Sequence, residues 1–238
     1  VNLRNMSANV ALINGIRQEG IMVPDGKNGQ KIALRDVLDR ELFGSGEALE
    51  QLVQIAIQTT DPRVPEYIRK DFYELTASEF EKQLAKDPTN LRTQSFAGAF
   101  YGRFGQYEQA LEHFKIALAL SPKRQSIYVD LGMMLISKGD FAQAEEVTKK
   151  GYEIWNGNTD AQLAYATALI YVGKGEQSEA ILGDAKNNPT AYDNRILNAY
   201  GTKGRQDKVI ALVNEKIVQG NATSRDYLLL ARGYAELG

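Results

Sequence analysis

The feature that most constrains the fold is a repeat of 34 residues in the middle of the chain. The segment LRTQSFAGAFYGRFGQYEQALEHFKIALALSPKR, which begins at Leu91, aligns without gaps on the next segment, QSIYVDLGMMLISKGDFAQAEEVTKKGYEIWNGN. Four pairs of residues recur in phase: Gly98 with Gly132, Gly105 with Gly139, Tyr107 with Phe141, and Ala110 with Ala144. A fixed period of this length indicates a solenoid of stacked helical hairpins.

Each recurring residue has a steric role in such a hairpin. The first glycine of each repeat lets the first helix approach the second closely, and the second glycine can take positive φ where the first helix ends. We expect the aromatic residue, Tyr107 or Phe141, to fill the core of its hairpin. The recurring alanine marks a tight crossing with the next helix.

The register continues towards the C-terminus with one change of length. Gly173 and Ala185 take the positions of Gly139 and Gly151, and a three-residue shortening then places Gly204 in the next equivalent position. The last segment, SRDYLLLARGYAELG, is in phase with the first helix of a further repeat. A single helix would leave a bare apolar face unless the chain continues or a partner covers it.

Upstream of the regular repeats, a long amphipathic helix is predicted with Pro65 near its first turn, and a second helix is predicted over residues 47–58. Two further helical segments, SANVALINGIRQEG and KIALRDVLDREL, precede them. We therefore divide the chain into an N-terminal helical repeat or cap (1–45), an elongated repeat (46–90), four regular repeats (91–124, 125–158, 159–189 and 190–223) and a half repeat (224–238).

The pattern over residues 91–223 resembles the tetratricopeptide repeat (TPR) family. This resemblance implies an all-α fold, a right-handed solenoid of antiparallel helix pairs. Residues 40–190, with LFGSGEALEQLVQIA, FYELTASEFEKQLAKDPTN, GRFGQYEQALEHF and LSPKRQSIYVDLG, are also similar to the soluble C-terminal repeat domain of bacterial O-antigen polymerase and ligase membrane proteins. That resemblance implies a parent protein that processes lipid-linked polysaccharide, with this domain as an appendage tethered at the inner membrane. The parent's catalytic Arg and His residues belong to a membrane region that no part of this chain matches.

Composition narrows the classes of function. Lys and Arg number 28 against 30 Asp and Glu, so no basic field for nucleic acid is expected. The chain has no cysteine, no apolar run of about 20 residues that could span a bilayer, and no signal peptide. It starts at Val1 without Met and ends after half a repeat, from which we expect a soluble fragment of a longer protein.

No pattern of catalytic or cofactor-binding residues is evident. The single histidine, His113, has no patterned partner for a triad or a metal site, and we expect it on the solvent-exposed convex face. The glycines of GAFYGRFG and VGKGE do not have the spacing of phosphate-binding loops. The sequence therefore predicts a protein that is not an enzyme and carries no cofactor or metal.

The predicted binding surface is the concave groove lined by the first helix of each repeat. Its candidate residues are Arg92, Phe96, Arg103, Asp130, Met133, Ile170, Tyr171, Asn194, Arg195, Asn198, Arg225 and Arg232. The apolar members either line the groove or are buried by neighbouring helices. The polar C-terminal members could hold a carboxylate or an acidic peptide and partly resemble the two-carboxylate clamp of chaperone-binding tetratricopeptide proteins, although Leu229 replaces an expected polar residue.

Two hypotheses of function follow. The first is a module that binds a protein or a peptide segment. The alternative is a self-association or spacer module that pairs through the terminal half repeat.

Overall fold

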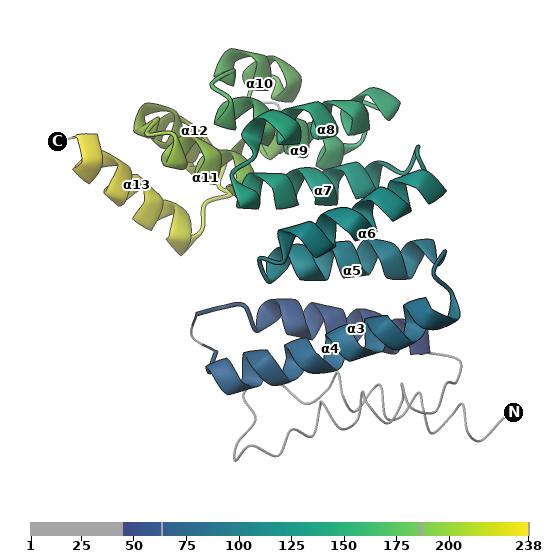
Figure 1. Cartoon of the computed structure of the whole chain (residues 1–238). Coiled ribbons are helices and arrows are strands. Elements are labelled where there is room, and N and C mark those ends of the chain that lie inside the picture. Colours follow the sequence, from purple (N-terminus) through teal and green to yellow (C-terminus); the bar gives the residue numbers. More distant parts are fainter. Residues whose placement is uncertain (1–44, 63, 186–187, 238) are drawn as a thin grey trace, which may run out of the picture. The chain divides into compact units, whose positions relative to one another are not determined.

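The computed structural model of the protein describes residues 45–62, 64–185 and 188–237 (Figure 1). Within these ranges the chain forms helices and turns, without a β-strand. The predicted N-terminal cap lies almost wholly outside the described residues. Two compact units divide the chain, Val1–Leu120 and Ser121–Gly238.

Unit 1 contains two helical hairpins in its described part. Their helices are α3 (Ser45–Gln58), α4 (Glu66–Lys86), α5 (Leu91–Arg103) and α6 (Tyr107–Leu120). Helix α4 begins directly after Pro65, as predicted. The side chain of Asn90 caps α5 by accepting a hydrogen bond from the Thr93 backbone N–H at 3.0 Å. Fully buried phenylalanines form the core of this unit: Phe72, Phe80, Phe100 and Phe114.

Unit 2 contains the remaining helices. They are α7 (Gln125–Lys138), α8 (Phe141–Ile154), α9 (Thr159–Tyr171), α10 (Gly175–Leu182), the 3₁₀ helix η2 (Pro189–Tyr192), α11 (Asn194–Thr202), α12 (Gln206–Val218) and α13 (Ser224–Leu237). Helix α9 packs against α7, α8, α10 and α11. Its sequence, TDAQLAYATALIY, is apolar on nearly every side, as expected of a helix buried within the unit.

The recurring glycines take the two roles predicted for them. Gly105 and Gly139 have φ values of 75° and 87°. After Gly139, the Asp140 N–H donates to the Leu135 carbonyl at 2.9 Å, a bond typical of a helix that ends in a left-handed glycine. Gly98 faces the ring of Phe114 on α6, at a distance that leaves no space for a β-carbon.

The recurring aromatic residue is not a core residue, so that prediction is wrong. Tyr107 and Phe141 are only half-buried, because each begins the second helix of its hairpin at the rim of the core. Phe141 instead stacks on Tyr171 of α9, with ring centroids 4.7 Å apart. In the hairpin of α5 and α6, Phe100 and Phe114 fill the core.

The third regular hairpin departs from the pattern of the first two. Helix α10 has 8 residues, whereas α6 and α8 have 14 each. It ends at Gly183, whose φ is 71°, so Ala185 lies beyond the helix and does not take the helical position of Gly151. The described residues confirm the predicted all-α solenoid of antiparallel helix pairs. The limits of the individual repeats stay a prediction.

Candidate functional site

The predicted groove residues of unit 1 lie on α5. The Arg92 Nε donates to Glu50 Oε1 of α3 at 2.9 Å, and its guanidinium lies over the ring of Phe96 at 6.0 Å from the centroid. Arg103 is exposed at the end of the same helix. Arg92 and Phe96 therefore lie together, and Arg92 also binds α3.

A line of charged residues crosses α7, α9 and α11 in unit 2. Arg195 Nη1 lies 3.2 Å from Asp160 Oδ1, and Arg195 Nε lies 2.9 Å from Asp193 Oδ1. Asp130 is partly exposed at the surface, but the protein around its carboxyl removes part of its hydration, which raises its pKa to about 6, and repulsion from Asp160 adds to the shift. The Asp130 carboxyl, which is partly desolvated and lies near the acidic Asp160, is therefore protonated at a higher pH than an ordinary aspartate.

The apolar candidates of the groove divide into two classes. Ile170 is 3% exposed and belongs to a buried cluster with Ile196 and Tyr200, so it cannot contact a ligand, and its assignment as a groove residue is corrected. The cause is the close packing of α11 on α9. Met133 and Tyr171 are half-buried, and Tyr171 is engaged by the ring of Phe141.

The polar candidates near the C-terminus are mostly accessible. Asn194, Asn198 and Arg225 are exposed, whereas Arg232 Nε donates to Glu236 Oε1 at 2.7 Å. Asn198 and Arg232 both line a hollow of about 260 Å³ between α11, α12 and α13. Since Arg195 and Arg232 are each paired with carboxylates of this chain, an acidic ligand would have to displace those partners.

The single histidine does not lie where the sequence predicted. His113 is half-buried: its ring stacks on Tyr101 with centroids 5.4 Å apart, and its Nδ1 lies 2.7 Å from Gln94 Oε1. Burial lowers the pKa of His113. The expectation of full solvent exposure was wrong, because the aromatic cluster of α5 extends over this position of α6.

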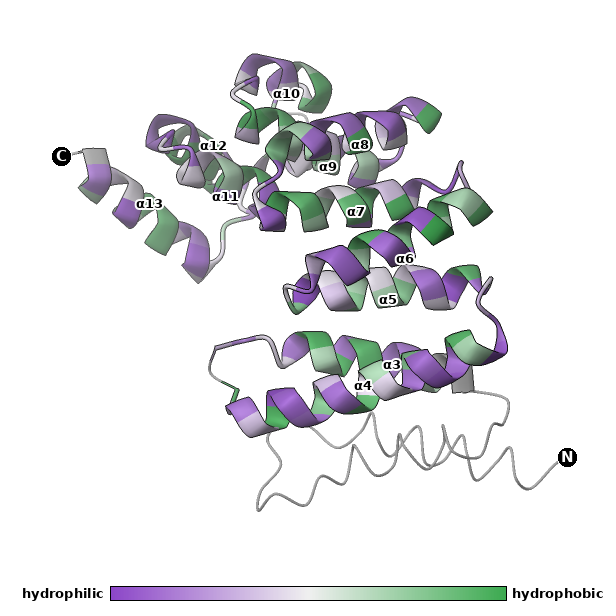
Figure 2. Ribbon diagram, viewed as in Figure 1, coloured by the Kyte–Doolittle hydropathy of each residue, from purple (hydrophilic) through white to green (hydrophobic). Residues whose placement is uncertain are grey.

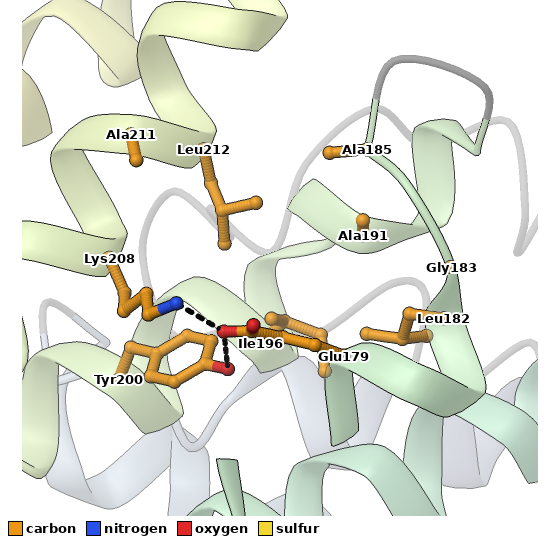
Figure 3. A pocket seen from close by; sticks show the side chains of 10 residues that line it. All are labelled: Glu179, Leu182, Gly183, Ala185, Ala191, Ile196, Tyr200, Lys208, Ala211 and Leu212. Carbon is orange, nitrogen blue, oxygen red and sulfur yellow. Dashed lines mark hydrogen bonds and ion pairs between the residues drawn. The ribbon is translucent and has the colours of Figure 1, made fainter. Parts of the chain in front are cut away.

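A pocket that the sequence reading missed lies beside the short helix α10 (Figure 3). Its volume is about 210 Å³, and its walls come from α10, the following turn, η2, α11 and α12. The lining residues are Glu179, Leu182, Gly183, Ala185, Ala191, Ile196, Tyr200, Lys208, Ala211 and Leu212. The sequence signal for this pocket is the three-residue shortening before Gly204.

Helix α13 has an uncovered apolar side. Tyr227 and Tyr234 are each 54% exposed and Leu228 is 71% exposed. The first turn of this helix is hydrophilic and its middle is hydrophobic (Figure 2). Its opposite side packs on α12, where Gly233 faces Ile210.

Two further kinds of feature are absent from the described residues. These residues contain no cluster of three His, Asp or Glu side chains that could hold a metal ion. In the same part of the chain, no helix has the length and apolar character needed to cross a bilayer.

Part of the chain is similar to a known family of repeats. Residues 103–153 match the family described as "Tetratricopeptide repeat". In the CTR9 homolog of Arabidopsis thaliana, 78 residues are 37% identical, which is 30% of this chain but 7% of that protein. The matched part of this chain therefore spans only a small fraction of that relative's length.

Two solved structures extend the similarity to most of the chain. A tetratricopeptide repeat protein from Parabacteroides merdae superposes with a TM-score of 0.61 at 15% identity, covering 96% of this chain and 86% of its own. YrrB, described as a TPR protein with an unusual peptide-binding site, has a TM-score of 0.50 at 15% identity, covering 85% of this chain and 98% of its own. At such identities these structures establish the fold alone.

Proposed function

We propose that this tetratricopeptide-repeat protein is a non-catalytic scaffold for protein–protein interaction, and that the uncovered face of α13 binds a helix of a partner. Repeat solenoids commonly bind helices or extended segments along surfaces that several helices build. YrrB, which shares the fold, is described as having a peptide-binding site. That description supports peptide or protein binding here.

Helix α7, the equivalent of α13 in an earlier repeat, indicates what kind of element packs on such a face. In the repeat register, Tyr227, Ala231 and Tyr234 of α13 correspond to Tyr128, Gly132 and Leu135 of α7. Helix α8 contacts the first two of these positions of α7, and the third is buried. The counterparts on α8 are Gly151, which touches the Tyr128 side chain, and Thr148, which touches Gly132, while Leu135 is 1% exposed.

The exposure of Tyr227, Leu228 and Tyr234 is the single observation that carries the proposal. Aromatic and aliphatic side chains gathered on one side of a helix mark an interaction surface more often than scattered apolar residues do. By analogy with α8, the partner is an amphipathic helix with small residues at the crossing point, since Ala231 leaves little space there. Burial of these side chains would supply most of the binding free energy.

Site-specific photocrosslinking in cells that naturally produce the protein tests this proposal. Ala231 would be replaced by p-benzoylphenylalanine, with the same replacement at Ala119, an exposed alanine of α6, as the matched control. We expect a specific partner to crosslink at position 231 only, through a peptide that mass spectrometry maps to an amphipathic helix. Equal crosslinking at both positions, none at 231, or a crosslink from 231 only to a further segment of the same chain would contradict the proposal.

A double substitution then tests whether the two tyrosine side chains contribute to binding of the partner found by crosslinking. Tyr227→Ser with Tyr234→Ser should weaken its binding by at least about tenfold, because two large apolar contacts are lost. Tyr67→Ser is the matched control, since Tyr67 is an exposed tyrosine of α4 at 57% exposure. Unchanged affinity in the double variant would exclude the α13 face.

Self-association through the same face is the second candidate function. The observation that favours it is the same exposed stripe, which a second copy of α13 could cover. Sedimentation velocity over a range of concentrations separates the two. A dimer that the tyrosine double variant loses would support self-association, and a monomer at all concentrations would exclude it.

The predicted groove residues remain part of the proposal. Asn194, Asn198 and Arg225 are exposed on or beside the helices that face the hollow between α11 and α13, so they are available to hydrogen-bond an extended segment. Asn198→Ala should weaken binding of a partner that uses this surface, and Asn214→Ala on α12 provides an amide control outside the hollow.

A finer proposal, that the domain belongs to a membrane protein of O-antigen assembly, is supported only by the sequence resemblance of residues 40–190. The decisive observation is the gene sequence that surrounds this segment. Several hydrophobic spans encoded upstream of Val1 would support the membrane parent, and their absence would remove it.

A further inference from the structure

The pocket beside α10 exists because a helix is short. Helix α10 ends at Leu182, where Gly183 turns the chain out of the helix with φ of 71°. In the preceding repeat, α8 continues to Ile154 and covers the equivalent part of its hairpin. The chain after α10 instead leads into η2, which closes only one side of the hollow.

Most of the pocket wall is hydrophobic core. Leu182, Ala191 and Ile196 are at most 4% exposed and belong to the central apolar cluster of the unit. Ala185 and Leu212 are partly buried members at the edge of that cluster. Figure 3 shows the side chains of Leu182 and Leu212 at opposite sides of the hollow.

The polar edge of the pocket is already internally paired. Glu179 Oε1 accepts a hydrogen bond from the Tyr200 hydroxyl at 3.2 Å and lies 2.6 Å from Lys208 Nζ (Figure 3). The positive charge of Lys208 and the negative charge of Glu179 therefore cancel locally. A charged ligand group would gain no unpaired partner here and would have to break one of these contacts.

We propose that this pocket accepts one aromatic or branched aliphatic side chain of a protein partner, as an anchor site separate from the α13 face. The volume of about 210 Å³ exceeds the roughly 150 Å³ of an apolar protein cavity that binds benzene. Apolar walls with one satisfied polar edge are typical of pockets that bury a hydrophobic anchor. Glu179, Tyr200 and Lys208 form the polar boundary of the apolar part of the pocket, so they limit the size of the side chain that can bind.

This inference deepens the proposed scaffold function but rests on different residues from those of α13. None of the pocket residues belongs to α13, so the crosslinking experiment on α13 can fail while the pocket binds, and the reverse also holds.

Disulfide capture measures such a weak site directly, because the chain contains no cysteine. Ala211 is exposed at the pocket edge, and Ala211→Cys places a single thiol there. Ala119→Cys on α6 is the matched control. Each variant is equilibrated with an equimolar mixture of 2-phenylethanethiol, 3-methylbutanethiol and 3-mercaptopropionamide under a thiol redox buffer, and the adducts are measured by intact-protein mass spectrometry.

The measured quantity is the ratio of the phenyl or branched aliphatic adduct to the amide adduct. We expect this ratio to be at least about tenfold higher at position 211 than at position 119, which corresponds to about 1.4 kcal/mol. Adding Ala185→Phe to Ala211→Cys should fill the pocket and remove this preference, with circular dichroism confirming that the variant is folded. Equal adduct ratios at positions 211 and 119 would overturn the proposal. A preference that persists in a folded Ala185→Phe variant would also overturn it.

Discussion

Gly132 of α7 lies so close to Thr148 of α8 that a β-carbon built on the glycine would be 2.2 Å from the Thr148 γ-methyl. The Thr148 hydroxyl donates to the Ala144 carbonyl at 2.7 Å, so the threonine is held in place by its own helix. The contact fixes how closely the two helices of this hairpin pack.

Gly132→Ala should therefore destabilise the protein. Ala is the better helix former by about 1 kcal/mol, but the overlap with a buried methyl group costs about 1–3 kcal/mol, so we expect a net loss. Urea denaturation measures the change. Thr148→Ser removes the clashing methyl group and keeps the hydroxyl, so the double variant should recover most of the loss; a double variant as unstable as Gly132→Ala would contradict this account.

Gly139→Ala tests the turn between α7 and α8. The φ of 87° is unfavourable for alanine, and we expect a loss of about 1 kcal/mol in the free energy of unfolding. Gly201→Ala is the matched control, because Gly201 lies in α11 with no atom within 4 Å of an added β-carbon. Thermal melts should show a lower midpoint for the first variant and an equal or higher midpoint for the second.

Asp226→Ala tests how α13 is held on α12. The Asp226 carboxylate is 2% exposed, lies 2.9 Å from Lys216 Nζ, and accepts hydrogen bonds from the backbone N–H and the hydroxyl of Thr223, each at 2.7 Å. Loss of one member of a buried ion pair typically costs about 3–5 kcal/mol. We expect hydrogen exchange to show lost protection in α13. Asp207→Ala, which removes an exposed carboxylate of α12, should leave that protection unchanged.

The same carboxylate predicts a dependence on acid. Burial alone would raise the pKa of Asp226. The hydrogen bonds from Lys216 and Thr223 lower it by more than burial raises it, so the pKa is below its ordinary value in the folded protein. Its contribution to stability is therefore present above the unfolded pKa of about 3.9 and is lost as the pH falls through the lower folded pKa. Melts between pH 5 and pH 2.5 should show a smaller acid-induced loss in Asp226→Ala than in the wild type.

Asp130 should have the opposite effect from Asp226 on how stability depends on pH. Its folded pKa of about 6 is above the unfolded value, so the stability it contributes is present below about pH 4 and is lost as the pH rises towards 6 and beyond. Asp130→Asn should raise the melting temperature at pH 7.5 and change it little at pH 4. Because the side chain is open to solvent, we expect the gain to be a small fraction of that of a fully buried acid. A gain that is equal at both pH values would contradict this assignment.

Much of the fold could be predicted because backbone and packing constraints repeat in the sequence. Gly105 and Gly139 recur since the same turn recurs, and Pro65 marks a helix start by its fixed φ. The hydrogen bond between Thr223 and Asp226 at the start of α13 was not predicted, and the ion pair of Asp226 with Lys216 depends on the packing of two helices.

The candidate sites were harder to predict because they depend on what neighbouring helices cover. Ile170 has the position of a groove residue in the repeat, but α11 packs over it. His113 seemed isolated in sequence, yet Tyr101 and Gln94 on another helix enclose it. The apolar side of α13 was expected from the repeat register alone, and Tyr227 and Tyr234 on that side are exposed.

The shortness of α10 has a wider consequence for how a repeat protein can change. Helix α10 has 8 residues where α8 has 14, and the buried core residues Leu182, Ala191 and Ile196 line the pocket beside it. The length of the second helix of a hairpin, as well as the identity of its core side chains, thus decides whether a solenoid has a cavity at that place. Small deletions in the second helix of a repeat are therefore a route to new specificity that comparison of residue identities alone would overlook.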